Sequence, residues 1–239
     1  MWPQAQHAVA ESFLLLAAGH HLAIAVVAVL LWIRRSSTER TVAVYFALAF
    51  ATATVALASH PSTRVLAAFA AGLSALWCLE IAHPRNVLSF DRTPRLRLTV
   101  MGALGIFALL YPGYSGDLPS FVFSPLGVIL PPTLLLALAL MNSAAPSTNR
   151  PVHWTLATIG LVTGAIGVFQ EGWVHAPLIA ASLYAVPLLL GRAKLLEDRG
   201  SIDATSVRAV HDRMHKRRVL LSRPRRSSVR KLDVRKRRK

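Results

Sequence analysis

Histidines and carboxylates spaced four residues apart occur at both ends of the apolar part of the chain. His7 is followed by Glu11, and Glu171 is followed by His175. Residues four apart share one face of a helix, so each pair can hold an imidazole against a carboxylate, which suits a zinc ion or a proton-coupled site. Alternatively, polar side chains gather at a membrane boundary because hydrocarbon excludes them. The predicted outer-face set comprises His7, Glu11, His60, Asp117, Glu171 and His175.

Two adjacent histidines, His20 and His21, lie near the centre of the apolar run from Ala10 to Ile33. They can serve as haem ligands, as proton-relay groups or as hydrogen-bond partners of a neighbouring helix. Adjacent helix residues point about 100° apart, so at most one of them faces a given neighbour. No other apolar run has a histidine at matching depth, which disfavours haem held by two histidines. We therefore expect a hydrogen bond between helices and predict no cofactor, with a single-histidine haem and a divalent metal left open.

Glu80 is the one further acidic residue inside an apolar run, near the end of the run at 65–82. A carboxylate at this depth needs a partner or must reach toward water. We expect Arg85, or another arginine of the connection that follows, to neutralise it. The predicted role of Glu80 is pairing rather than chemistry.

Two consecutive prolines, Pro131 and Pro132, interrupt the middle of the apolar run at 121–141. They lack backbone N–H groups and clash with the preceding turn, so the helix is predicted to kink or break there. Thr133 can satisfy backbone groups that the break frees. A structural kink is the favoured interpretation, and an ion or substrate site built on the break is the alternative.

Several kinds of chemistry find no support in the residues. The single Cys78 excludes an intramolecular disulfide and a cysteine-based metal cluster. No lysine precedes Lys194, which excludes a retinal Schiff base in the last apolar run. No nucleophile motif, phosphate-binding glycine loop or zincin helix is present. We therefore lean against an enzyme.

The elements that must position these residues are apolar runs long enough to be helices. Of the 239 residues, 54% are hydrophobic and only 16% are charged, which is too apolar for an ordinary soluble domain. The predicted fold class is all-α, a polytopic membrane helix bundle. It has about seven transmembrane helices, near 10–33, 41–59, 65–82, 98–111, 121–141, 152–169 and 173–190.

Basic residues predict the orientation of these seven runs. The connections assigned to the cytoplasm carry three, four and one Lys or Arg, whereas the outer connections carry Arg64 alone. Because basic residues stay on the cytoplasmic side, the N-terminus is predicted outside and the C-terminus inside. Aromatic residues agree, since Tyr111 and Trp173 fall at the predicted outer boundary and Trp154 at the inner one. The expected location is the cell inner (plasma) membrane.

Small residues recur at helical spacing in two of the runs. One set is Gly160, Gly164 and Gly167; the other is Ala68, Ala71, Gly72 and Ala75. Small side chains let helix backbones approach closely in lipid. Packing inside the bundle is the favoured interpretation for both sets, and a homo- or hetero-oligomer seam in the membrane is the alternative.

A basic cytoplasmic tail follows the bundle, so the predicted domains are 1–191 and 192–239. The tail holds 18 of the 27 Lys and Arg residues and 5 of the 11 acidic ones. A short amphipathic helix is predicted at about 205–221, followed by a disordered segment. The expected partners are anionic lipids, with an acidic protein or RNA as the alternative. The residues expected to bind are Arg208, Arg213, Lys216, Arg217, Arg218, Arg225, Arg226, Arg235, Lys236, Arg237, Arg238 and Lys239.

One part of the chain carries a distinctive set of prolines, aromatic residues and small residues: Tyr111-Pro112, Pro119, Phe121, Pro125, Gly127, Pro131-Pro132-Thr133, Pro151, Trp154 and Gln170. This set resembles an uncharacterised family of bacterial multi-pass inner-membrane proteins, a domain of unknown function. The resemblance implies a bacterial inner-membrane location and no particular activity.

The functional expectation follows from the absence of a catalytic constellation beside an extended basic tail. We expect a non-enzymatic accessory or assembly subunit whose tail engages anionic lipid or an acidic partner. The alternatives are a small proton-coupled transporter that uses the proline-broken fifth run, and a haem- or metal-binding redox membrane protein.

Overall fold

The computed structural model describes residues 2–33, 38–86, 88, 93–111, 124–145 and 148–190. Within these ranges all regular structure is helical and no strand occurs. The predicted tail helix and all the tail residues lie outside the described residues, as does Asp117. The expected helical fold class is therefore confirmed for the bundle.

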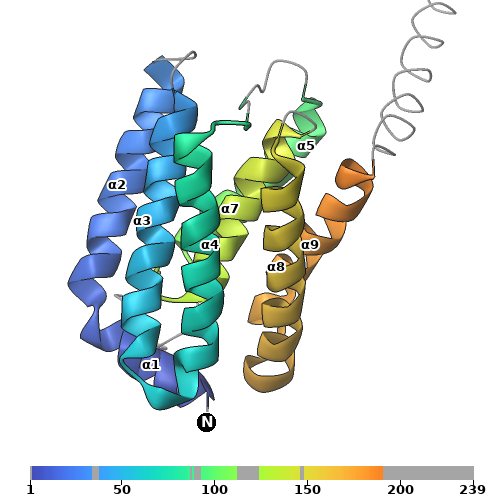
Figure 1. Ribbon diagram of the computed structural model, residues 1–239. Helices are drawn as coiled ribbons and strands as arrows, with labels where there is room; N and C mark the ends of the chain where they lie inside the picture. The colour runs from blue at the N-terminus through green and yellow to red at the C-terminus, as the bar shows by residue number, and fades with distance from the viewer. Residues whose placement is uncertain are drawn as a thin grey trace, which may run out of the picture. The chain divides into compact units, whose positions relative to one another are not determined.

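Eight α-helices and two single 3-10 turns make up the described chain (Figure 1). They are α1 (Trp2–Ser12), α2 (Leu14–Ile33), α3 (Thr38–Ala58), η1 (Pro61–Thr63), α4 (Arg64–Ala82), α5 (Arg95–Leu109), α7 (Leu130–Ala144), α8 (Arg150–Glu171), η2 (Trp173–His175) and α9 (Ala176–Leu189). Figure 1 shows α2, α3 and α4 side by side as one group, with α5, α7, α8 and α9 forming the rest of the bundle.

Aromatic and small side chains hold neighbouring helices together. Phe46 of α3 stacks on Trp77 of α4, with ring centroids 5.0 Å apart and planes 28° apart. Offset stacking of this kind adds to the free energy gained by burying the rings. α7 lies at the centre of the bundle, and most of its side chains are buried.

Three helical segments are long and apolar enough to cross a membrane: Glu39–Ala58, Pro61–Ala82 and Arg150–Glu171. A fourth is obtained if the bent pair of α1 and α2 counts as one span. α7 and the segment Trp173–Leu189 are apolar but shorter. Large apolar side chains such as Leu15 and Phe169, each 90% exposed, point away from the bundle. These features indicate a membrane-associated helical protein.

The first apolar run is not a single helix, contrary to the prediction. α1 ends at Ser12 and α2 begins at Leu14, and the two helices are bent by 73°. The Ser12 hydroxyl donates a hydrogen bond to the Ala8 carbonyl oxygen at 2.7 Å. A serine that bonds back to the preceding turn in this way favours a bend in a helix. The predicted span therefore begins with a separate short helix.

The proline pair lies at a helix start, whereas the sequence predicted a kink inside a helix. α7 begins at Leu130, so Pro131 and Pro132 occupy its first turn. The N–H groups of a first turn have no partner within the helix, so their absence costs little there. The preceding residues, Ser124–Ile129, form a non-helical turn that is completely buried.

Thr133 satisfies backbone groups of this turn, as predicted. Its hydroxyl donates to the Ile129 carbonyl oxygen and accepts the Gly127 N–H, both at 2.9 Å. Non-helical backbone at membrane depth requires such internal partners because no water is present to replace them.

Candidate functional site

The end of α8 and the following 3-10 turn bring together a carboxylate, an imidazole and a phenol. His175 Nε2 lies 2.7 Å from Glu171 Oε2, and His175 Nδ1 lies 2.7 Å from the hydroxyl oxygen of Tyr111. Tyr111 is fully buried and His175 is 1% exposed. The sequence-predicted pair of Glu171 and His175 is therefore in contact, although η2 rather than a continuous helix places it.

Glycines allow His175 to occupy this position. Gly172 ends α8 with a φ of +90°, a conformation that side chains disfavour, and so turns the chain toward α9. A Cβ added at Gly167 would lie 2.4 Å from Cγ of His175, so the imidazole packs directly on the α8 backbone. A larger residue at position 167 would displace the imidazole from this position.

This arrangement can move a proton. With the carboxylate ionised, Glu171 accepts the Nε2–H of His175, and Nδ1 then accepts the hydroxyl proton of Tyr111. A carboxylate that orients an imidazole toward a hydroxyl is a common device for proton transfer. Sequence reasoning identified Tyr111 only as a boundary aromatic, because its contact depends on where α5 ends relative to η2.

The other members of the predicted outer-face set do not join this pair within the described chain. His60 Nδ1 lies 2.8 Å from the hydroxyl oxygen of Ser62, in its own connection. Glu11 is exposed on α1, whereas the side chain of His7 and all of Asp117 lie outside what is described. Among the described side chains, no three His, Cys, Asp or Glu residues gather in a way that could hold a metal ion.

His20 makes the predicted hydrogen bond between helices. Its Nε2 lies 2.7 Å from the hydroxyl oxygen of Thr52 on α3, and that hydroxyl also lies 2.7 Å from the Gly127 carbonyl oxygen. A consistent assignment has His20 donating to Thr52 and Thr52 donating to Gly127. The buried turn, α2 and α3 are thereby joined at one point.

His21 faces two carbonyl oxygens. Its Nδ1 lies 2.9 Å from the oxygen of Ala17, and its Nε2 lies 3.0 Å from the oxygen of Leu109 at the end of α5. A carbonyl only accepts hydrogen bonds, so both contacts are satisfied together only when the ring carries two protons. His21 thus links α2 to α5, and the adjacent pair contacts two different neighbours, as the 100° separation predicts.

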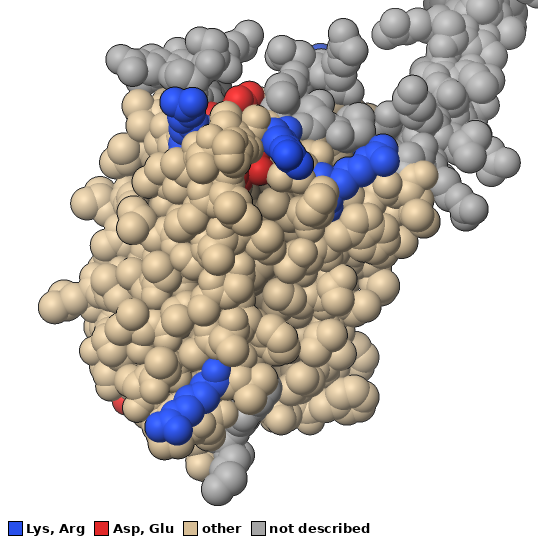
Figure 2. Space-filling view, viewed as in Figure 1, with Lys and Arg blue, Asp and Glu red and all other residues tan. Residues whose placement is uncertain are grey.

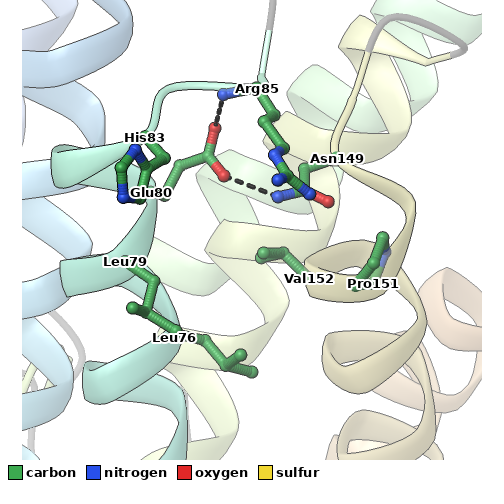
Figure 3. Close-up of a pocket in the computed structure, with 8 residues that line it drawn as sticks. All are labelled: Leu76, Leu79, Glu80, His83, Arg85, Asn149, Pro151 and Val152. Carbon is green, nitrogen blue, oxygen red and sulfur yellow. Dashed lines mark hydrogen bonds between the residues drawn. The ribbon is translucent and has the colours of Figure 1, made fainter.

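Glu80 is buried at the opposite end of the bundle and joins three segments (Figure 3). Its Oε1 accepts the backbone N–H groups of Arg85 and Asn86, and its Oε2 accepts the Asn149 side-chain amide at 2.7 Å. Arg85 thus meets this carboxylate through its backbone. The predicted pairing role agrees with this geometry, but amide donors from the α4–α5 and α7–α8 connections supply it.

A further polar cluster, around His153, was not predicted from the sequence. His153 Nε2 lies 2.8 Å from Asn142 Oδ1, and its Nδ1 lies 3.1 Å from the Thr148 hydroxyl oxygen. Asn142 in turn donates to the Ala181 carbonyl oxygen at 2.9 Å. The cluster joins α7, α8 and α9. The sequence marked His153 only as a residue at a span end, because asparagine and threonine carry no distinctive pattern.

The two predicted small-residue sets differ in their surroundings. Added Cβ atoms at Gly160 and Gly164 would lie 2.6 Å from Ser182 Oγ and 2.9 Å from Ile179 Cγ1, so these glycines pack against α9 as predicted. On α4, by contrast, the predicted internal packing is wrong. The four residues there point outward: Ala68, Ala71, Gly72 and Ala75 are all exposed.

The chain was compared with family models, curated proteins and solved structures. No family model, curated protein or solved structure matches it. The resemblance to a bacterial inner-membrane family therefore stays a prediction.

Proposed function

We propose that the chain is a seven-span integral protein of the inner (plasma) membrane, with its N-terminus outside, that serves as a non-enzymatic accessory or assembly subunit. Its basic tail would engage anionic lipid or an acidic partner on the cytoplasmic side. The distribution of arginines over the two ends of the bundle supports this proposal.

From α2 onward the helices alternate in direction, so the starts of α3, α5 and α8 and the end of α4 share one end of the bundle (Figure 1). The exposed arginines of these segments are Arg40, Arg85, Arg95 and Arg150. The opposite end carries Arg64, at the start of α4. Figure 2 shows basic side chains gathered near one end of the visible face, with one at the other end. Such asymmetry is typical of an oriented membrane protein.

The orientation gives the tail its proposed role. α9 ends at Leu189, at the arginine-rich end, so the segment 192–239 would leave the bundle on the cytoplasmic side. Each basic residue near anionic headgroups contributes about 1 kcal/mol to attraction toward the surface. The excess of 18 basic over 5 acidic residues makes this attraction the dominant property of the tail.

The test compares the full chain with a chain truncated after Arg199. Both are placed in nanodiscs of phosphatidylglycerol or phosphatidylcholine, and trypsin cleavage of the tail is followed at low and high salt. Cleavage of the full chain should be slower in phosphatidylglycerol at low salt. Both chains should insert, and proteins that co-purify with the full chain should be lost on truncation. Equal cleavage in both lipids, together with unchanged co-purification, would overturn the proposal.

A second candidate, a proton-coupled transporter, is favoured by the contact of Glu171 with His175 and Tyr111. A proton taken up here would be shared between the Glu171 carboxylate and the His175 imidazole, next to the Tyr111 hydroxyl, and the non-helical turn before α7 lies beside His20. Non-helical backbone between helices also lines the binding sites of many transporters.

Flux measurements in liposomes test this candidate. Proton uptake by the Glu171→Gln, Tyr111→Phe and His20→Ala variants is compared with that of the wild type, with Glu39→Gln at the start of α3 as the control. The candidate requires at least a tenfold loss in the first two variants and wild-type uptake in the control. Wild-type uptake in every variant would eliminate it.

A further inference from the structure

A cleft of about 260 Å³ opens between the end of α4 and the start of α8 (Figure 3). Its lining combines two kinds of side chain, polar ones near the end of the bundle and apolar ones further along the helices. The lining residues are Leu76, Leu79, Glu80, His83, Arg85, Asn149, Pro151 and Val152.

The polar part of the cleft exposes one guanidinium group, that of Arg85. Arg85 and His83 are exposed, whereas Glu80 is only 3% exposed and its oxygens accept three N–H groups. The start of α8, at Arg150, adds the partial positive charge of a helix N-terminus. Because both oxygens of Glu80 already accept N–H groups, the exposed guanidinium of Arg85 is the charged donor that an anion entering the cleft would meet.

The apolar part of the cleft continues onto the outer surface of α4. Leu76 and Val152 line its wall, and Leu79 is 61% exposed. In a membrane-spanning helix, such an exposed leucine faces hydrocarbon. The cleft is therefore polar toward the end of the bundle and apolar toward the membrane interior, in the same sense as a phospholipid.

We propose that this cleft binds one phospholipid of the cytoplasmic leaflet, with its phosphate on Arg85 and an acyl chain along Leu76 and Leu79. Arginine matches phosphate geometry through paired N–H donors. A free phosphate ion would leave the apolar wall uncovered, whereas an acyl chain covers it. The site rests on the membrane orientation proposed above, and it is independent of the tail.

Native mass spectrometry of the full chain, purified in mild detergent and exchanged against phosphatidylethanolamine or phosphatidylglycerol, measures the binding. Arg85→Gln removes the phosphate contact but keeps the backbone N–H that Glu80 accepts. Leu79→Trp obstructs the acyl wall at an exposed position. Arg40→Gln removes an exposed arginine at the same end of the bundle, outside the cleft, and serves as the matched control.

The wild type and Arg40→Gln should each retain one phospholipid, and Arg85→Gln and Leu79→Trp should bind it about tenfold more weakly. Inorganic phosphate at millimolar concentration should not displace the lipid. Equal retention by all four proteins would overturn the proposal, as would a site that phosphate alone fills. If the chain instead stayed soluble without detergent, the membrane orientation itself would fail, which is a distinguishable result.

Discussion

Both carboxylate oxygens of Glu80 accept hydrogen bonds from connections between helices, so one buried side chain orders two connections at once. Oε1 binds the residues that follow α4, and Oε2 binds Asn149 directly before α8. A buried carboxylate is costly unless donors replace the water it loses. Here the donors come from backbone and amide groups, so the carboxylate acts as a structural link.

Replacing Glu80 with alanine should destabilise the bundle by about 3 kcal/mol, because three N–H donors lose their acceptor. Glu80→Gln should fall between this variant and the wild type, since its amide oxygen can still accept the two backbone N–H groups. Thermal unfolding in detergent measures both effects. The control, Glu39→Ala in the first turn of α3, should change the stability by less than about 1 kcal/mol. A Glu80→Ala protein as stable as this control would contradict the linking role.

Single residues were predictable where their type is unusual for their surroundings. Glu80, His20 and the pair of Glu171 and His175 stand out because ionisable groups are rare in apolar runs. Their partners did not stand out. Tyr111 reaches His175 only because α5 ends near η2, and such a contact depends on three-dimensional packing that spacing along the chain does not encode.

At the scale of elements, the turn Ser124–Ile129 is the least regular part of the described bundle. Gly127 has a φ of +71°, and an added Cβ there would lie 2.3 Å from Cδ2 of His20. Backbone conformation and side-chain packing therefore both require glycine at this position.

Gly127→Ala should cost about 3 kcal/mol of stability, from backbone strain together with the clash against His20. In a His20→Ala background the clash disappears, and the same substitution should cost about 1 kcal/mol. A double-mutant cycle on unfolding in detergent measures the difference. Additive effects would show that the imidazole does not press on the turn.

The contact of α8 with α9 should be equally sensitive to side-chain size. Gly164→Leu inserts a side chain against Ile179 and should lower stability by roughly 2 kcal/mol. Gly72→Leu on the exposed face of α4, where an added Cβ meets nothing within 4 Å, should change it by less than about 0.5 kcal/mol. Similar unfolding midpoints for the two variants would show that α8 and α9 do not pack as closely as described.

The positions of the helices were largely predictable, and the positions of their ends were less so. The predicted run at 65–82 agrees with α4, and the run at 152–169 lies within α8. The prediction of one helix over the fifth run was wrong because the segment from Val122 to Val128 is as apolar as a buried helix. Hydrophobicity alone cannot separate a buried turn from a buried helix, so Pro131 and Pro132 were placed inside a helix instead of at its start.

At the scale of the whole molecule, the proposed orientation predicts which connections reagents reach from each side. In a Cys78→Ala background, Ser59→Cys lies between α3 and α4 and His83→Cys follows α4, at the opposite end. A membrane-impermeant maleimide added to spheroplasts, whose inner membrane is intact, should label residue 59 but not residue 83. Opening the membrane should expose residue 83. The reverse pattern would invert the topology, and labelling of both in intact spheroplasts would contradict it.

The whole-molecule architecture was predictable only in outline. Composition identifies a membrane-associated helical chain, and three or four helices are long and apolar enough to cross a bilayer. α5 and α7 have 15 residues each and reach only about 22 Å at 1.5 Å per residue. Packing against neighbouring helices, rather than length, determines the positions of α5 and α7. A count of apolar runs treats the seven runs as equivalent, although the helices they form differ in length.

The buried turn before α7 also constrains the order in which the chain is assembled. The Gly127 carbonyl oxygen accepts the hydroxyl of Thr52 on α3, 75 residues earlier, so this polar group has its partner only once α3 is in place. A nascent chain emerges from the ribosome N-terminus first, so α2 and α3 are synthesised before the turn Ser124–Ile129. A circular permutation that places the second half of the chain first would have the turn synthesised before the helix that carries its hydrogen-bond partner Thr52.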